Sequence, residues 1–235
     1  MTNPPQNSAN FKNRNALIVV AKQPIAGQVK TRLCPPLSAE IAADLAHAFL
    51  EDTISMGRGC RGVDVILGYA PFRAESWFEA AFSQIDCVSQ GEGDLGARMT
   101  RLSATAFERG CERVVLIGAD TPFLTSRRVE EAFEALNATS DSVVIGPAED
   151  GGYYLIGMSE PTPELFRDMP WSQESVLSET LNRIQGLGLK VRLLETKRDI
   201  DALHDLDWLS QNLERLPEIS KTREWFENAQ QFWHE

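Results

Sequence analysis

The sequence predicts an α/β fold with a mainly parallel sheet and helices on both of its faces. Short β-branched, apolar runs alternate with longer segments of helical periodicity along the 235 residues. The first run, ALIVVA at 16–21, is continuously apolar, as is typical of strands buried on both faces. After residue 141 two apolar runs follow each other with only a loop between them, which predicts one antiparallel strand in an otherwise parallel sheet.

The expected elements follow one another in a regular order. Strands are expected at 16–21, 63–70, 85–90, 112–120, 141–148, 153–158 and 190–195. Helices are expected at 38–57, 74–82, 94–110, 125–138 and 172–188. Ser38, Asp94 and Thr125 precede three of these helices and are residue types that favour N-caps.

Length and composition favour one large domain with short additions at its ends. We expect a polar leader at 1–14, a folded domain at 15–215 and a helical tail at 216–235. In the tail, Trp225 and Phe226 stand seven residues before Phe232 and Trp233. This helical spacing predicts that the tail packs back on the domain or onto a second subunit, so a homodimer is one option.

Charge and cysteine content exclude several function classes. A formal charge of −11 argues against general nucleic-acid binding, although a small basic pocket is compatible with it. The four cysteines are widely spaced and form no CxxC pair, which favours reduced thiols in a cytoplasmic protein. No apolar stretch approaches a membrane span, so we expect no membrane partner.

The loop after the first strand carries Lys22, Lys30 and Arg32 around Gly27. Ligands of open α/β sheets bind beyond the carboxyl ends of the strands, where this loop lies. Two residues separate Gly27 from Lys30, so the loop is not a Walker motif. Lysine and arginine there favour polyphosphate binding, and ordinary solvated surface charge is the alternative.

Three aspartates follow other predicted strands. Asp120 emerges in LIGADTPFL and is a candidate ligand for a hard divalent cation such as Mg²⁺ or Mn²⁺. Asp199 and Asp201, two residues apart, are candidates for a second metal carboxylate. Helix capping is the structural alternative for Asp120 and for Asp201.

A glycine pair and a tryptophan are weaker candidates. Gly151 and Gly152 allow close approach of a ligand to the backbone, and a simple hairpin turn explains them almost as well. Trp171 is suited to stacking on a base or sugar, but tryptophan more often packs in a core.

Taken together, these segments resemble the GT-A type of nucleotide-dependent transferase. Within it the chain resembles a small bacterial glycosyltransferase-like family, long of unknown function, with some members assigned to arsenosugar biosynthesis. The resemblance spans roughly residues 15 to 210 and rests on AKQPIAGQVKTRL, GADTPFL, EDGGYYLIG, MPWSQESVLSETL and DIDALHDL in that order. VKTRL and DTPFL also resemble the phospholactate guanylyltransferase branch. Many GT-A glycosyltransferases carry Asp-x-Asp, where this chain reads Gly118-Ala119-Asp120.

The resemblance implies a set of site residues. Its nucleotide would be held by residues of the first loop, of the segment around QGEGD and of the metal site: Ala21, Lys22, Lys30, Arg32, Gly91, Gly96 and Asp120. The acceptor would face Gly151, Gly152, Tyr153 and Trp171. The metal, Mg²⁺ or Mn²⁺, would bind Asp120 with Asp201 or Asp199.

Three functions compete at this stage. The first is metal-dependent transfer of a sugar from a nucleoside-diphosphate sugar to a small acceptor. In it Lys30 and Asp120 act on the diphosphate, and Glu149 or Asp150 acts as general base. The second is nucleotidyl transfer from a nucleoside triphosphate to a phosphorylated small molecule. The third is a non-enzymatic nucleotide-binding module.

Overall fold

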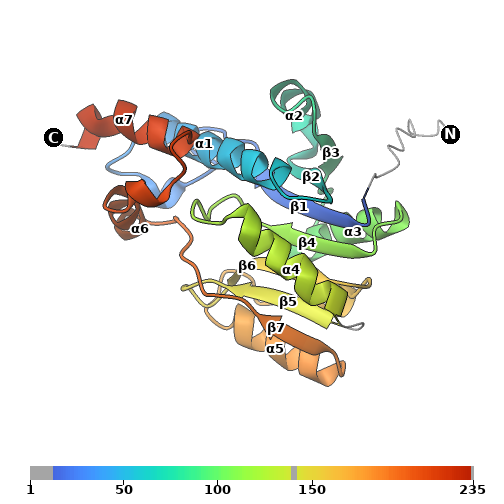
Figure 1. Ribbon diagram of the computed structural model, residues 1–235. Coiled ribbons are helices and arrows are strands. Elements are labelled where there is room, and N and C mark those ends of the chain that lie inside the picture. The colour runs from blue at the N-terminus through green and yellow to red at the C-terminus, as the bar shows by residue number, and fades with distance from the viewer. Residues whose placement is uncertain (1–12, 139–141, 234–235) are drawn as a thin grey trace.

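The computed structural model describes residues 13–138 and 142–233, and its described strands form one sheet in the order β3-β2-β1-β4-β6-β5-β7 (Figure 1). The strands are β1 (Asn15–Lys22), β2 (Val63–Ala70), β3 (Asp86–Ser89), β4 (Arg113–Ile117), β5 (Ser142–Pro147), β6 (Tyr153–Met158) and β7 (Lys190–Leu193). The helices are α1 (Ala39–Arg58), α2 (Glu75–Ala81), α3 (Leu95–Glu108), α4 (Ser126–Ala138), α5 (Val176–Gly186), α6 (Leu203–Ser210) and α7 (Lys221–Trp233). The predicted α/β fold class is confirmed.

The sheet is parallel except at β6, which confirms the prediction of one antiparallel member. β6 pairs antiparallel with both β4 and β5, whereas the other pairs are parallel. The carboxyl ends of the parallel strands and the start of β6 therefore share one edge of the sheet. The loops that follow β1, β4 and β7 and the turn between β5 and β6 lie at this edge.

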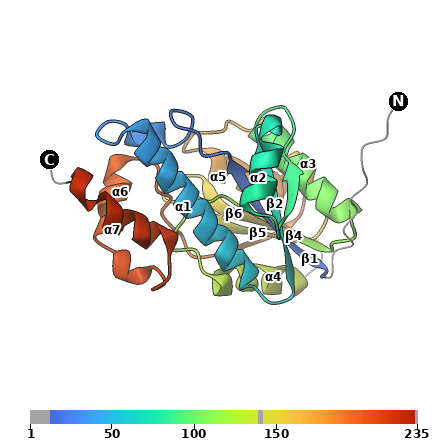
Figure 2. The same cartoon turned by 90° about the horizontal axis from the view of Figure 1, so that it is seen from above.

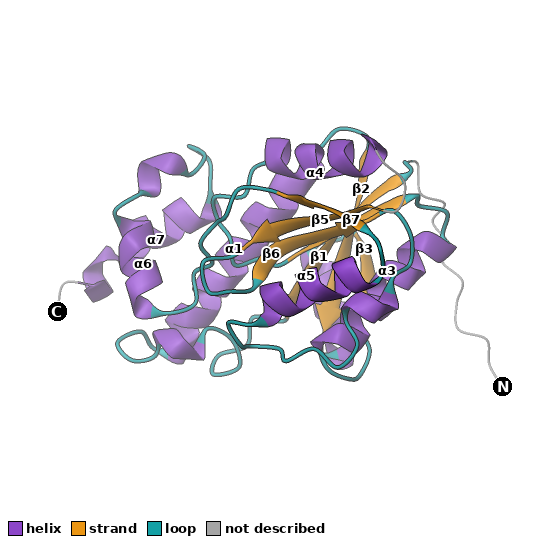
Figure 3. Cartoon of the chain, turned by 90° about the horizontal axis from the view of Figure 1, so that it is seen from below, coloured by secondary structure: helices purple, strands orange, loops and turns teal. Residues whose placement is uncertain are grey.

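Alternate residues of the central strands feed two separate cores. In β1, Leu17 and Val19 belong to a cluster with α1, α2 and α4, and Ile18 belongs to a cluster with α3 and α5. Figure 2 shows the face covered by α1, α2 and α4, and Figure 3 shows the face covered by α3 and α5. The continuous apolar run of the first strand reflects this burial on both sides.

The predicted helix starts are confirmed by their caps. Ser38 Oγ accepts a hydrogen bond from the Ile41 amide, and Asp94 Oδ1 accepts one from the Ala97 amide at 2.8 Å. Thr125 Oγ1 accepts from the Arg128 amide in the same way. Each cap satisfies an amide that has no partner within the helix.

The carboxy-terminal part of the chain closes the molecule beyond the carboxyl edge of the sheet. Trp225 and Phe226 of α7 are buried in a third cluster with α1 and α6, and the Trp225 indole donates to the Ile41 carbonyl. The tail thus packs back on the domain, one of the two predicted outcomes. The expected contacts of Phe232 and Trp233, and the leader at 1–12, lie outside what the structure describes. Among the described residues, no helix is long and apolar enough to cross a membrane.

Candidate active site

The Lys30 ammonium is the centre of the candidate site. Its Nζ lies 2.5 Å from Asp120 Oδ1, 2.7 Å from Asp201 Oδ1 and 2.6 Å from the Ile200 carbonyl oxygen. The Lys30 side chain is only 6% exposed, whereas those of Asp120 and Asp201 are each 47% exposed. The structure thus brings together three predicted site residues that lie far apart in the sequence.

The surroundings of Lys30 keep it charged. Burial alone would lower the pKa of its amine, but the carboxylates of Asp120 and Asp201 raise the pKa above its ordinary value. The Phe49 ring lies 5.7 Å below the ammonium and adds a cation–π contact. The Lys30 backbone has a φ of 49°, in the left-handed region, where a lysine is strained.

The backbone after β7 delivers Asp201 to this position. The Ile200 amide donates to the Asp120 carbonyl at 2.9 Å, so the two loops lie side by side. Helix α6 is capped by Asp205, whose Oδ2 accepts from the amides of Asp201 and Ala202. Since Ala202 is the N-cap residue, the capping role considered for Asp201 is wrong, and its carboxylate faces Lys30 instead.

Asp199 is a third acid of the same edge, set deeper than the other two. It accepts a hydrogen bond of 2.5 Å from Thr121 Oγ1, a buried hydroxyl. Burial, followed by the negative charges of Asp120, Asp201 and Asp150, raises the pKa of Asp199 to about 7, although the Thr121 hydrogen bond lowers it. At neutral pH this carboxyl is therefore partly protonated.

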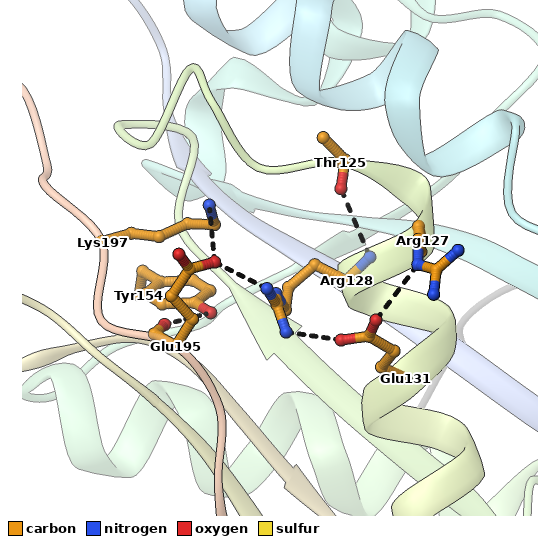
Figure 4. A network of polar contacts seen from close by, with 7 residues as sticks. All are labelled: Thr125, Arg127, Arg128, Glu131, Tyr154, Glu195 and Lys197. Carbon is orange, nitrogen blue, oxygen red and sulfur yellow. Dashed lines mark hydrogen bonds and ion pairs between the residues drawn. The ribbon is translucent and has the colours of Figure 1, made fainter.

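Contacts with α4 fix the segment that carries Asp199 and Asp201 (Figure 4). Arg128 bridges Glu131 and Glu195 at 2.5 and 2.6 Å, and the Tyr154 hydroxyl donates to the Glu195 carbonyl. The Lys197 amide donates to the Pro147 carbonyl, and the Lys197 carbonyl accepts from the Glu149 amide. The backbone around Lys197 therefore extends the pairing along β5. The acids that follow are thus held on a rigid support.

The other cations of the first loop are free of such contacts. Lys22 and Arg32 are exposed, and neither pairs with another residue that the structure describes. Ala21, also predicted to contact the nucleotide, is buried, and its carbonyl accepts from Gln90 Nε2 at 2.8 Å. Gln90 also donates to the Gly68 carbonyl, so one buried amide joins the ends of β1 and β2.

The segment after β3 is tightly packed. A Cβ on Gly91, which has a φ of +69°, would meet the Arg101 guanidinium, whose Nη2 donates to the Glu92 carbonyl. Gly96, in the first turn of α3, lies against the Phe166 carbonyl and the Trp171 ring. Trp171 thus packs on α3, the structural alternative considered for it, and its buried Nε1 has no hydrogen-bond partner among the described residues.

We expect Gly96→Ala to destabilise the protein. An ideal Cβ at Gly96 would lie 2.2 Å from the Phe166 carbonyl oxygen, so α3 and the facing loop must separate. The expected loss is about 2 kcal/mol, or about 4–8 °C in melting temperature. Gly186→Ala, in α5 with open space around it, is the matched control and should be neutral or slightly stabilising. Equal melting temperatures for the two variants would contradict this packing.

The glycine pair forms the turn into β6. Gly151 has a φ of +87°, and the Gly152 amide donates to Asp150 Oδ1 at 2.9 Å, which supports the hairpin interpretation. Asp150 is exposed, whereas Glu149 is paired with Arg198 at 2.6 Å. Tyr153 packs in the cluster with α3 and α5, where burial raises its pKa although the Thr180 side chain lowers it.

The site residues therefore fall into two groups. Lys30, Asp120, Asp199 and Asp201 lie together, with Asp150 close enough to influence Asp199 electrostatically. Tyr153 and Trp171 instead pack against the cluster that α3 and α5 form on one face of the sheet. Within the described part of the chain, no group of three or more His, Cys, Asp or Glu side chains forms a metal-binding cluster. A cavity of about 590 Å³ lies between α4 and β7, and no predicted site residue lines it.

Three supporting residues escaped the sequence analysis: Gln90, Thr121 and Asp205. Each is polar and buried, and each lies at a strand end or in the first turn of a helix. A search for polar residues just after apolar strands would have found Gln90 and Thr121. Asp205 stands three residues after Ala202, the spacing at which an acid caps its own helix, and this pattern would have identified it.

Residues 53–173 match a family model described as "Uncharacterized protein conserved in bacteria (DUF2064)". The match covers more than half of the chain. The chain belongs to this family. No curated protein matches the sequence.

Solved structures of other proteins have a fold similar to that of this chain. A "putative nucleotide-diphospho-sugar transferase" from Desulfovibrio desulfuricans G20 is 29% identical, with a TM-score of 0.87 over 94% of this chain and 96% of that one. A nucleotidyl transferase from Methanothermobacter thermautotroptrophicus is 16% identical, with a TM-score of 0.57 over 85% and 97%. A CMP:2-keto-3-deoxy-manno-octonic acid synthetase complexed with CTP is 11% identical, with a TM-score of 0.54 over 86% and 99%. The DUF2064 chain thus has the fold of nucleotide-dependent transferases, and the resemblance inferred from its motifs is confirmed.

Proposed function

We propose that this protein transfers a sugar from a nucleoside-diphosphate sugar to a small acceptor with the help of Mg²⁺ or Mn²⁺. The observation that carries the proposal is the meeting of Lys30, Asp120 and Asp201 at the carboxyl edge of the sheet. The name of the D. desulfuricans relative supports the donor class. Nucleotidyl transfer is the alternative, because the same charges suit a triphosphate.

The acids at this edge fit a divalent cation. Asp120 and Asp201 each direct one oxygen at the Lys30 ammonium, which lies where a metal cation would bind. Mg²⁺ is commonly held by one or two protein carboxylates together with substrate phosphates, so two acids are sufficient. Asp120 with Asp201 would hold the ion, which when bound neutralises charge on the leaving diphosphate.

The first loop supplies the remaining positive charge. Arg32 and Lys22 are exposed and have no partner among the described residues, so they are available to phosphate oxygens. A guanidinium binds two phosphate oxygens at once and orients the group that it holds. Arg32 would thus position the diphosphate, and Lys30 would neutralise it as charge develops.

Asp150 is our candidate for the general base. It is exposed at the same edge, while Glu149, the other candidate, is engaged by Arg198. The Gly152 amide orients the Asp150 carboxylate through Oδ1 and leaves its other oxygen free to accept a proton from an acceptor hydroxyl.

A donor screen tests the proposal. Nucleotides and nucleotide sugars are assayed by thermal shift with and without Mn²⁺, and the donors that bind are then tested for turnover. A nucleoside-diphosphate sugar should raise the melting temperature in the presence of Mn²⁺, and a nucleoside diphosphate should be released on turnover. Release of pyrophosphate from a triphosphate would establish the alternative instead. If no compound of either class binds, the proposal fails.

Arg32→Gln tests the role of the first loop. We expect it to raise KM for the donor by about tenfold or more and to change kcat less, because the side chain orients a ground-state phosphate. The melting temperature should not move, since Arg32 is exposed. Arg61→Gln, an exposed arginine at the opposite edge of the sheet, is the control and should leave KM unchanged. An unchanged KM in Arg32→Gln would remove this residue from the site.

A further inference from the structure

We propose that Lys30 is an internal counter-ion that a divalent cation must displace, and that its release couples metal binding to donor binding. The inference rests on the proposed function, because it concerns the same two carboxylates. It goes further in assigning Lys30 two positions, one on the aspartates and one on the donor phosphates.

In the first position, on the aspartates, all three N–H groups of the Lys30 ammonium already have acceptors. An ammonium group has three N–H donors, and the Lys30 Nζ has three oxygens within 2.7 Å, from Asp120, Asp201 and the Ile200 carbonyl. With a side chain only 6% exposed, Lys30 has no donor left for a phosphate. In this arrangement Lys30 therefore neutralises the acids and does not serve the donor.

A divalent ion and the Lys30 ammonium cannot both bind the carboxylate oxygens of Asp120 and Asp201. Asp120 and Asp201 are each 47% exposed, so a divalent ion can reach them from solvent. Once it binds there, the ion and the buried ammonium are like charges at short range, and they repel strongly in the partly dry site. A divalent ion also neutralises the acids more fully than the Lys30 ammonium does, because it carries two positive charges and the group of acids includes Asp199.

The backbone around Lys30 favours movement of its side chain away from the two aspartates. It stands at the end of a loop that contains Gly27, which has a φ of +75° and open space around it. The left-handed backbone of Lys30 itself is unfavourable for a side-chain-bearing residue, and its ion pairs compensate for that strain. Loss of the ion pairs thus favours a new backbone conformation, in which the freed ammonium can reach the phosphates of a donor.

Coupling follows from this exchange. Metal binding releases a cation for the donor, and a donor that captures Lys30 frees the carboxylates for metal. By linkage the two effects are equal in size, so metal and donor should strengthen each other's binding.

The experiment measures Lys30 itself and needs no donor. Amine acetylation of the wild-type protein is followed by mass spectrometry with and without Mn²⁺. Lys30 should be protected without the metal, and saturating Mn²⁺ should raise its labelling rate by about tenfold or more. Lys190, exposed on β7, is the internal reference and should be labelled equally in both conditions.

Metal affinity gives a second readout. Lys30→Met removes the competing charge, so it should bind Mn²⁺ alone about tenfold more tightly than wild type, measured by the free-Mn²⁺ paramagnetic resonance signal. Lys190→Met should match wild type. Lys30 labelling that does not change at saturating Mn²⁺, or equal affinities for wild type and Lys30→Met, would overturn the inference. Donor turnover by a protein whose Lys30 stays protected would overturn it while leaving the proposed function intact. Release of Lys30 by Mn²⁺ without binding of any donor would support the displacement of Lys30 by metal, while the coupling to a donor and the proposed function would fail.

Discussion

Asp120→Asn should reduce turnover by at least about a hundredfold. Asp120 is the proposed metal ligand of the 118–120 loop and contacts Lys30 at 2.5 Å, so an amide in its place weakens both the metal site and the counter-ion. The fold should survive, because the Asp120 side chain is half exposed and Lys30 keeps Asp201 and the Ile200 carbonyl. We expect a stability loss of about 1 kcal/mol, measured by denaturant unfolding beside the steady-state rate.

Asp207→Asn is the matched control for this change. Asp207 is an exposed acid of α6 on the same side of the molecule, so its removal alters net charge equally and should leave turnover unchanged. Full activity in Asp120→Asn would remove this residue from the site. Loss of turnover in a folded Asp120→Asn protein would rule out a purely non-enzymatic nucleotide-binding module.

Asp199→Asn should stabilise the metal-free protein at neutral and alkaline pH. The folded-state pKa of Asp199 is raised to about 7 by burial and by neighbouring acids, against an ordinary value of 3.8. Between these two values the folded state binds a proton that the unfolded state has lost, so the stability of the wild type falls as pH rises from about 4 to about 7. Asparagine keeps an oxygen for Thr121 and carries no charge, so the variant lacks this loss.

The advantage of Asp199→Asn should therefore be absent near pH 4, grow towards pH 7 and stay constant above it. Its full size is on the order of 4 kcal/mol. The measurement is urea unfolding across this pH range with a chelator present. Adding Mn²⁺ at pH 8 should narrow the gap, because a cation relieves the repulsion among the acids. If the stabilities of wild type and Asp199→Asn change in parallel with pH, the pKa of Asp199 is not raised by burial and by its neighbours.

Much of the fold was predictable because the relevant signals are local. The apolar run at 16–21 is continuous because helices cover both faces of β1, and Ser38 and Asp94 cap helices with bonds that span three residues. The position of Asp120 and Asp201 on one edge also follows from the rule that parallel strands end together.

The rest depends on contacts that no local pattern encodes. The sequence suggested cations facing acids across a bound diphosphate, but Lys30 touches Asp120 and Asp201 directly, because a buried ammonium needs anions close to it. Asp201 was considered as a helix cap, yet Asp205 takes that role from within α6. Tyr153 lies next to the glycine turn in sequence, but strand alternation directs its side chain into the cluster with α3 and α5, whereas Tyr154 faces the cluster with α1, α2 and α4.

Lys30 and Asp201 are 171 positions apart in the chain, and this separation governs when the site comes into being during synthesis. A nascent chain that has formed β1 to β4 already holds Asp120 but still lacks Asp199 and Asp201, so the Lys30 ammonium has only one of its two carboxylate partners. Under the proposed function, a chain that ends before Asp199 would bind metal and donor weakly, because it lacks two of the three acids of the site.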